Sequence, residues 1–333
     1  MSQSGFAVRL QGVTKAFGKR TAVSDLNLDV PRGVVYGLLG PNGSGKTTTI
    51  RMIMGILHPD SGSVSLFGGD PDVTRRTKVG YLPEERGVYR KMKCLDLVTF
   101  LGEIRGMARA EARRRGLAWL ERLGLPEWAD KKVEDLSKGM QQKIQFIGTV
   151  IHEPELLILD EPFSGLDPIN QDLLEEIVLD FRARGTTILF STHLMDQAER
   201  LCERVCLISR SKKVLDGELA TLKAAGRKGV VAIEFTGPDR WVDGPEVARV
   251  EAVNGGLHLI LNEGADHQAI LRRGVQAGAE ILRFDLVEPR LHEIFVRYAG
   301  VDAVTEESAP TSGGYTATPS GRAARPGTRA GGR

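Results

Sequence analysis

The chain has 333 residues, of which 41% are apolar and 26% are charged, so it can bury the core of one large domain and of a smaller one. Its 45 lysine and arginine residues nearly balance its 43 aspartate and glutamate residues, which argues against a general attraction to nucleic acid or anionic lipid. Three cysteines without the spacing of a disulfide framework fit a reducing compartment.

No stretch approaches the roughly 20 apolar residues that span a bilayer, and residues 1–20 lack the apolar core of a signal peptide. We therefore expect a cytoplasmic protein that needs a partner for any work across a membrane. Cys202 and Cys206, with His193 upstream, are poorly spaced for zinc, because zinc usually takes four more tightly paired ligands. Buried thiols are the preferred interpretation.

In chain order, residues 8–28 form short runs suited to strands. Residues 34–39 are an apolar run typical of a buried strand, and residues 48–57 are expected to form a helix. Between them lies Gly40-Pro41-Asn42-Gly43-Ser44-Gly45-Lys46-Thr47, which fits the phosphate-binding pattern G-x-x-x-x-G-K-[ST]. This pattern requires a strand, a loop and a helix in that order.

The residue types of this loop each have a physical reason. Its three glycines let the backbone pass close to a polyphosphate, in conformations that a side chain would forbid, so that N–H groups point at anionic oxygens. Lys46 would place its ammonium against the β- and γ-phosphates, and the Thr47 hydroxyl would bind Mg²⁺. Thr48 begins the helix whose N-terminus faces the phosphates. The sequence therefore predicts a nucleoside triphosphate site at residues 40–48.

Further strands are expected at residues 63–67 and 79–83. Residues 94–150 change to helical spacing and are expected to form a helical insertion. Strands return, with helices between them, at residues 156–160, 186–191 and 205–209. This alternation predicts an α/β fold with a mostly parallel sheet and helices on both of its faces.

The apolar strand at residues 156–160 ends in the two carboxylates Asp160 and Glu161. A strand of this kind delivers Asp160 beside the phosphate loop, where it would hold Mg²⁺ directly or through water. Glu161 would then accept a proton from the water that attacks the γ-phosphate, or orient that water. The alternative, two solvated acids at a strand end, is disfavoured by the complete phosphate loop.

A second anion site is predicted at Leu136-Ser137-Lys138-Gly139-Met140-Gln141. Ser137 would cap the helix that runs to about residue 152, and Gly139 leaves the first turn of this helix unobstructed, so that a hydroxyl and bare amides meet there. One chain rarely needs two γ-phosphate sites. We therefore expect this site to serve the nucleotide bound to another copy of the chain.

With these motifs the chain resembles the nucleotide-binding subunit of an ABC transporter, from residue 8 to about residue 225. Ser164-Gly165-Leu166-Asp167 matches the family's D-loop, Ser191-Thr192-His193 matches its switch histidine, and Phe17 matches the aromatic residue that stacks on adenine. Packing in the core is the alternative for Phe17 and for His193. Lys138 departs from the family, because it replaces the first glycine of the usual signature.

The resemblance implies an ABC ATPase fold with antiparallel strands near the N-terminus, and a head-to-tail dimer that binds ATP and Mg²⁺. Each ATP would lie between the phosphate loop of one copy and Ser137 and Gly139 of the other, and Asp167 also counts as nucleotide-binding. His193 would contact the γ-phosphate and hold the attacking water and Glu161 in line. Many relatives carry glutamine at the position of Glu84, and Glu84 would either bind Mg²⁺ more strongly or be displaced until the dimer closes.

Pro83-Glu84-Glu85-Arg86-Gly87 and residues 287–296 resemble ABC-2 type exporter subunits, similar to bacterial sodium-extrusion and drug- or antibiotic-resistance ATPases. That subgroup carries a small accessory domain at the C-terminus. Alternating strands and helices predict a small α+β unit here at residues 226–300, after an ATPase domain at residues 1–225. Residues 301–333 have almost nothing to bury and are expected to be disordered.

The expected partners are a second copy of the chain and an integral membrane permease, which would hold the protein at the cytoplasmic face of the cell membrane. The permease would dock near residues 84–93, where Val88, Tyr89 and Met92 are apolar residues in a loop, although packing under the helical insertion is an alternative for them. A soluble clamp or switch in DNA repair or translation is the alternative function. It is disfavoured because the phosphate loop occurs once and neither a zinc module nor a long coiled coil is present.

Overall fold

The computed structural model describes residues 5–85, 87, 89–226, 229–253 and 256–299. The first of its three sheets is antiparallel, with the strand order β2-β1-β4. Its strands are β1 (Phe6–Phe17), β2 (Arg20–Pro31) and β4 (Ser61–Leu66). The antiparallel strands expected near the N-terminus are therefore present.

The second sheet has the strand order β5-β6-β7-β3-β8-β9 and is parallel except for β9. Its strands are β3 (Val35–Leu39), β5 (Val79–Leu82), β6 (Leu156–Asp160), β7 (Thr187–Thr192), β8 (Arg204–Ser209) and β9 (Lys212–Glu218). Alternate side chains of β6 enter opposite cores, with Leu157 and Leu159 on one face and Leu156 and Ile158 on the other. The continuous apolar sequence of this strand follows from its burial on both faces.

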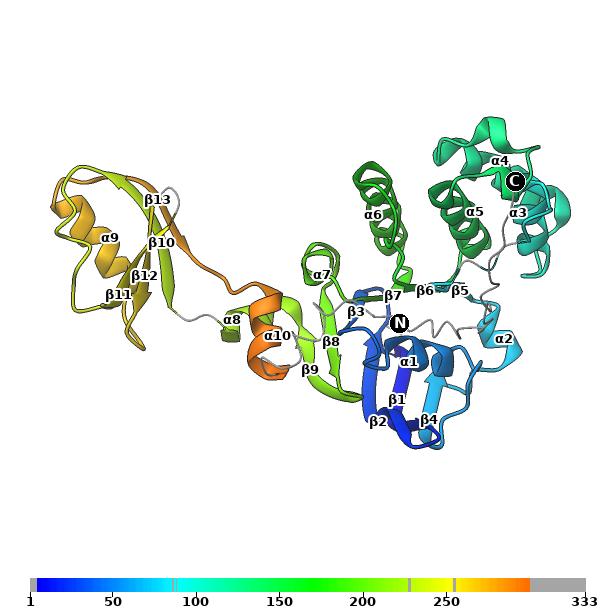
Figure 1. The fold of residues 1–333 in the computed structure, drawn as a ribbon, viewed down its shortest axis with the longest axis horizontal. Coiled ribbons are helices and arrows are strands. Elements are labelled where there is room, and N and C mark those ends of the chain that lie inside the picture. The colour runs from blue at the N-terminus through cyan, green and yellow to red at the C-terminus, as the bar shows by residue number, and fades with distance from the viewer. Residues whose placement is uncertain (1–4, 86, 88, 227–228, 254–255, 300–333) are drawn as a thin grey trace, which may run out of the picture.

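The layers of the main body follow from these two cores. The first sheet and α1 (Lys46–Ile53) cover one face of the six-stranded sheet. The other face is covered by α5 (Lys138–Val150), α6 (Pro168–Ala183) and α7 (Met195–Leu201), as Figure 1 shows. The predicted α/β fold with a mostly parallel sheet is confirmed.

The expected helical insertion is also present. It contains α3 (Cys94–Glu103) and α4 (Arg109–Arg122), then two 3₁₀ turns at Pro126–Trp128 and Val133–Asp135, and then α5. Trp119 of α4 stacks on Phe181 of α6, with ring centroids 6.0 Å apart and an interplanar angle of 4°. This contact joins the insertion to the main body. The short helix α2 (Val73–Arg76) precedes β5.

The third sheet is antiparallel, with the strand order β11-β12-β10-β13, and forms the small α+β unit with α9. Its elements are β10 (Val230–Thr236), β11 (Val247–Val253), β12 (Gly256–Leu261), α9 (His267–Gln276) and β13 (Glu280–Leu286). Its own core includes Ile233, Trp241, Leu259 and Ile270. Figure 1 shows this unit projecting from the main body, which it joins through α8 (Leu219–Gly226) and through the chain after β13.

The last helix, α10 (Leu291–Ala299), differs from the expectation. The sequence placed it in the accessory unit, yet Leu291 and Phe295 lie in the core of the main body, and α10 packs on α7, α8 and β9. The apolar spacing of a helix shows that one face is buried but not which body buries it. The C-terminal unit therefore ends in a helix that belongs by its packing to the main body.

Two boundaries and one strand also differ from the sequence-based expectation. Helix α1 begins at Lys46 and ends at Ile53, because Gly45 and Gly55 have positive φ values of 113° and 63°. Strand β9 was not expected, because its sequence mixes charged and apolar residues, as suits a partly exposed edge strand. Residues 301–333, expected to be disordered, lie outside the described residues. In the described part of the chain, no helix is long and apolar enough to cross a membrane.

Candidate functional site

The phosphate loop joins β3 to α1 and is held tightly by its neighbours. Gly40, Gly43 and Gly45 have positive φ values of 148°, 76° and 113°. A Cβ atom on Gly40 would lie 2.1 Å from the carbonyl oxygen of Ile208, and one on Gly45 would lie 2.4 Å from that of Ala22. Both the backbone conformation and the close approach of β8 and β2 therefore require glycine.

Lys46 places its ammonium inside this loop. Its Nζ donates hydrogen bonds to the carbonyl oxygens of Gly40 at 2.7 Å and Pro41 at 3.2 Å, and lies 3.5 Å from Oε1 of Glu161. Lys46 is only 5% exposed, so its charge is compensated by these oxygens rather than by water. Ser44 Oγ is buried beside it and has no hydrogen-bond partner among the described residues. The loop thus offers a buried cation and an unpaired hydroxyl to an anion.

Asp160, at the end of β6, is 1% exposed. Its Oδ1 accepts a hydrogen bond from Ser191 Oγ, and the hydroxyl of Thr47, at the start of α1, is among the groups that lower the pKa of this carboxylate. Oδ2 is buried and has no hydrogen-bond partner within the described ranges. Burial raises the pKa of Asp160, against the hydrogen bonds that lower it. A hydroxyl and a buried carboxylate with a free oxygen are hard donors that fit Mg²⁺.

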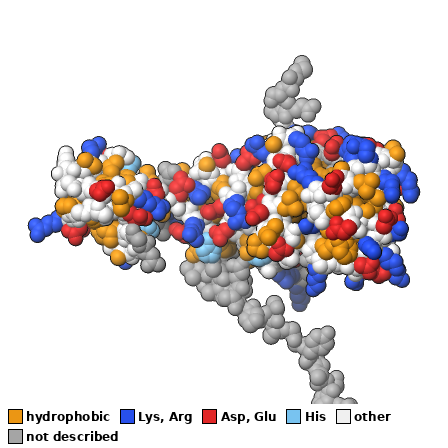
Figure 2. Space-filling model, turned by 90° about the horizontal axis from the view of Figure 1, so that it is seen from above, with side chains coloured by type: hydrophobic (Ala, Val, Ile, Leu, Met, Phe, Trp, Pro, Cys, Tyr) orange, Lys and Arg blue, Asp and Glu red, His pale blue; other side chains and the backbone are white. Residues whose placement is uncertain are grey.

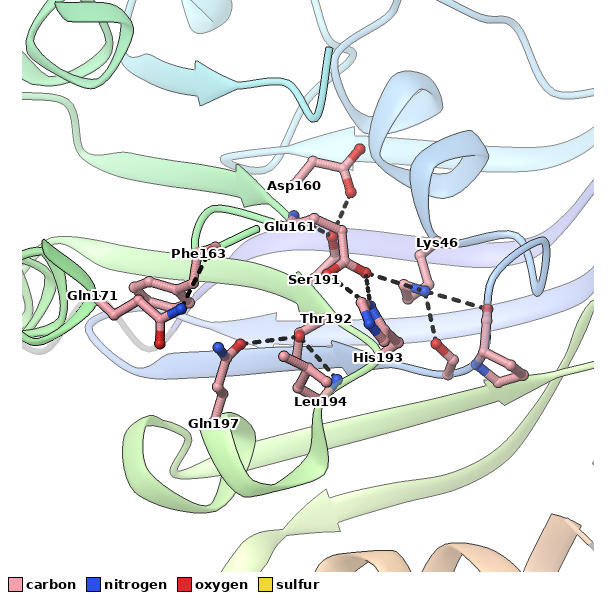
Figure 3. Close-up of polar contacts among 12 residues, drawn as sticks. Lys46, Asp160, Glu161, Phe163, Gln171, Ser191, Thr192, His193, Leu194 and Gln197 are labelled. Atoms are coloured by element: carbon pink, nitrogen blue, oxygen red, sulfur yellow. Dashed lines mark hydrogen bonds and ion pairs between the residues drawn. The ribbon is translucent and has the colours of Figure 1, made fainter. Parts of the chain in front are cut away.

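Glu161 follows Asp160, and its backbone has the left-handed conformation, with a positive φ of 48°. This left-handed conformation costs a residue other than glycine about 1 kcal/mol, and such outliers gather at functional sites. The two carboxylate oxygens of Glu161 lie 3.1 and 3.0 Å from Nδ1 of His193. Figure 3 shows Lys46, Glu161 and His193 pointing toward one another.

His193 lies between β7 and α7, and its side chain is 29% exposed. It is fixed by the turn around it, because the Thr192 hydroxyl accepts from the backbone N–H of Leu194 at 3.0 Å and donates to Gln197 Oε1 at 3.3 Å. Its exposure and its contact with Glu161 argue against the alternative that it is a core histidine. The structure thus brings together the loop, Asp160, Glu161 and His193.

The second predicted anion site lies apart from this cluster. Ser137 caps α5, since its Oγ accepts from the backbone N–H of Met140 at 3.3 Å, and Ser137 itself is exposed. A Cβ atom on Gly139 would have Leu166 Cδ2 at 3.8 Å as its nearest neighbour, so the space around it is open. No described contact joins Ser137 or Gly139 to Lys46, Asp160 or Glu161.

Asp167, Phe17 and Glu84, the other residues expected at the site, lie in three different settings. Asp167 caps α6, where it accepts from the backbone N–H of Asn170 at 3.1 Å and from its side-chain amide at 2.5 Å, and these bonds lower the pKa of Asp167. Phe17 is 51% exposed, so it is not a core residue. Glu84 is exposed and has no contact with Thr47 or Asp160 in the part of the chain described.

The loop that was expected to meet a permease is only partly exposed. Tyr89 is exposed and packs edge-on against Phe100 of α3, with ring centroids 5.9 Å apart. Met92 packs against a core that includes residues of the helical insertion, which fits the alternative that it lies under this insertion. Val88 lies outside the described residues.

Two functional contacts were missed in the sequence. Ser191 pairs with Asp160 in the register of β6 and β7, and its hydroxyl donates a hydrogen bond to the Asp160 carboxylate. The available signal was a polar residue near the end of a buried strand next to β6. Arg20 places its guanidinium over the loop, 3.2 Å from where a Cβ on Gly43 would stand, and a lone arginine after a turn gave no signal.

The cysteines are buried, in agreement with the sequence analysis. Cys202 and Cys206 lie in different cores, on opposite faces of the six-stranded sheet. Burial raises the pKa of both thiols, and it raises the pKa of Cys94 to about 11. Within the described residues, no group of three or more histidine, cysteine, aspartate or glutamate side chains could hold a metal ion.

Comparison with known families gives two matches along the chain. Residues 23–164 match the family described as ABC transporter. Residues 217–299 match the family described as ATP-binding protein DrrA1-3-like, C-terminal domain. The second match begins before β10 and includes α10, so this family's C-terminal domain extends to the helix that packs on the main body.

Individual relatives cover nearly the whole chain. The uncharacterized ABC transporter ATP-binding protein YhaQ of Bacillus subtilis is 44% identical over 290 residues, which are 86% of this chain and 97% of that protein. The Nod factor export ATP-binding protein I of Paraburkholderia xenovorans is 34% identical over 302 residues, 88% of this chain and 97% of that protein. A solved structure, of an ATP-binding subunit of an ABC transporter, superposes with a TM-score of 0.62 at 30% identity and covers 66% of this chain and 93% of that one.

Proposed function

The chain belongs to the family of ABC transporter ATP-binding proteins, and on this premise we propose that two copies of it enclose ATP and Mg²⁺ head to tail and drive a separate membrane permease. Proteins of this family are ATPases that power transport. The observation that carries the dimer is the separation of two half-sites in one chain. Ser44, Gly45 and Lys46 of the phosphate loop are buried and Lys46 lies beside Glu161, whereas the Ser137 end of α5 is exposed and contacts neither Lys46 nor Glu161.

The chemistry follows from the described contacts. Thr47 and Asp160 would hold Mg²⁺, which would supply positive charge to the phosphates. Lys46 would exchange its bonds to the loop carbonyls for bonds to phosphate oxygens, which accept more strongly because they are charged. Glu161 would take the proton of the attacking water, and His193 would hold the Glu161 carboxylate in position through Nδ1.

Phe17 and the second half-site would complete the nucleotide site. The exposed ring of Phe17 would stack on adenine. Ser137 and Gly139 of the other copy would offer a hydroxyl and the amides of a helix N-terminus to the γ-phosphate. Glu84, which has no contact with the metal-binding residues here, would approach the site as the dimer closes.

Export is proposed as the direction of transport. It is supported by the relative named for Nod factor export and by the DrrA-like C-terminal match. The permease would dock near Tyr89 and Phe100, an exposed aromatic pair at the start of the helical insertion, and would hold the ATPase at the cytoplasmic face of the membrane. Figure 2 shows lysine, arginine, aspartate and glutamate side chains interspersed over the visible face, rather than the single-sign field that suits nucleic acid.

Replacement of Glu161 by glutamine tests this function. The amide keeps the size of the side chain but cannot take a proton, so ATP turnover should fall about 10²- to 10⁴-fold while ATP binding persists. The variant should form a dimer in the presence of ATP and Mg²⁺, measured by light scattering. Glu153→Gln, at an exposed position, is the control and should keep turnover. Unchanged turnover in Glu161→Gln, or an ATP-loaded variant that stays monomeric, would contradict the proposal.

A further inference from the structure

Helix α10 packs on the helix that follows the switch histidine. It returns from the small sheet and contacts α7, α8 and β9. Leu291 and Phe295 of α10 share one core with Met195 and Ala198 of α7. Figure 1 shows α10 (orange) beside α8 and β9, between the projecting small unit and the rest of the main body. The last helix of the C-terminal unit therefore forms part of the surroundings of α7.

Polar contacts strengthen this packing. A carboxylate oxygen of Glu199, on α7, accepts the backbone N–H of Leu291 at the start of α10. Lys223 of α8 lies 3.7 Å from Glu199 and 3.7 Å from Glu288. We call Glu199, Lys223, Glu288 and Leu291 the Glu199 latch. Because the side chains of Glu199 and Lys223 are only 20% and 22% exposed, this pair is less screened by water than a surface pair.

The other side of α7 is also held. Arg200 pairs with Glu175 of α6 at 2.6 Å, so α7 lies between α6 and α10. A single residue, Leu194, separates His193 from the first residue of α7. The side chain of Gln197, on α7, bonds to Thr192. A shift of α7 that carried His193 about 1 Å away from Glu161 would therefore lengthen their contact beyond hydrogen-bonding distance.

We propose that α10 is a positioning element of the catalytic site, which sets the place of α7, and so of His193, through the Glu199 latch and Phe295. The inference rests on the proposed ATPase function. Four residues, 287–290, join β13 to α10, so a partner that moves the small sheet would act on His193 along this route. Packed elements in direct contact transmit such coupling, and single changes along them alter it by about two- to thirtyfold.

Turnover measurements on the full chain test the proposal. Glu199→Ala and Phe295→Ala should lower kcat about two- to thirtyfold and leave ATP binding unchanged, because the phosphate loop does not contact the latch. Glu199→Gln keeps an acceptor for Leu291 and Phe295→Leu keeps an apolar side chain, so both should recover most of the turnover. Arg297→Ala, on the exposed face of α10, is the matched control and should have the turnover of the wild type.

A signal from His193 separates positioning from a general loss of structure. The imidazole resonances of His193, assigned by their absence from His193→Ala, should shift in Glu199→Ala and Phe295→Ala but not in Arg297→Ala. If kcat is unchanged, or if it falls while the His193 signal stays in place, the proposal is wrong. If Phe295→Ala does not fold, Glu199→Ala decides. If the wild type does not hydrolyse ATP, the proposed function fails, and the resonance shift still tests the positional link.

Discussion

Two helices of this chain begin with lysine at an expected anion site, and they differ in what surrounds them. Lys46 begins α1 behind a glycine in the left-handed conformation, and is buried among loop carbonyls and Glu161. Lys138 begins α5 behind the cap Ser137 and is exposed. The first site has buried charge and a backbone that only glycine permits, whereas the second has one capping bond and open space.

The difference shows which part of the anion-binding site a single chain can form by itself. Water screens charges at the end of α5, so the amides there bind an anion weakly by themselves. At α1 the side chains of Lys46 and Asp160 are buried, so water screens their charges less, and the amides at the start of this helix act together with them. The α5 end gains comparable strength only when a second surface covers it, which is what a head-to-tail dimer provides.

The largest effect is expected from removal of the buried lysine. Lys46→Ala should weaken ATP binding at least about thirtyfold, since loss of one partner of a buried charge pair costs about 2–5 kcal/mol. A fluorescent ATP analogue titrated against the protein measures this. Lys138→Ala is the matched control, because it changes the first residue of the other helix, and its affinity for ATP should stay within about twofold of the wild type. If both variants lost ATP affinity equally, the two helix ends would not differ in nucleotide binding as described.

A carboxylate at the second site should act on association rather than on the monomer. Gly139→Asp puts negative charge in the first turn of α5, where the helix dipole favours it by about 0.3–1 kcal/mol, so the thermal stability of the monomer should not fall. ATP-dependent dimerisation of a Glu161→Gln background should be lost, as seen by light scattering. Gly139→Ala controls for size, because the added Cβ meets only Leu166 at 3.8 Å. A dimer that survives the Asp substitution would show that this end of α5 does not face a phosphate.

The smallest effect is expected at Asp167. Hydrogen bonds from Asn170 lower its pKa in the folded state, so its contribution to stability is present at neutral pH and is lost as the pH falls through this lowered pKa. Asp167→Ala should therefore melt below the wild type at neutral pH, with the gap closing in acid. Asp172→Ala, exposed on the same helix, should show no such gap. A gap that stays constant as the pH falls would contradict this account, whereas a loss of turnover would fit the expected contact of Asp167 with nucleotide.

The sequence predicted the parts of the site that local chemistry requires. The loop, Asp160, Glu161 and His193 stand at strand ends, and parallel strands deliver their ends to one edge of a sheet. It did not predict where α10 packs, because the apolar face of an amphipathic helix does not indicate which part of the protein will cover it. Nor did it predict Arg20 over the loop, since that contact depends on how β2 meets β3 and α1 in space.

The path of the chain through α8 and α10 also determines which residues could be removed without loss of the main body's packing. Because the polypeptide leaves the main body at Gly226 and comes back at Leu291, the four-stranded unit is an insert looped out between two docked helices rather than an appendage. Truncation after residue 226 would remove α10 and expose Met195 and Leu219, whereas a short glycine linker in place of residues 229–287 would keep α10 packed on them. Replacement of the four-stranded unit alone would then keep the packing of α10 on α7.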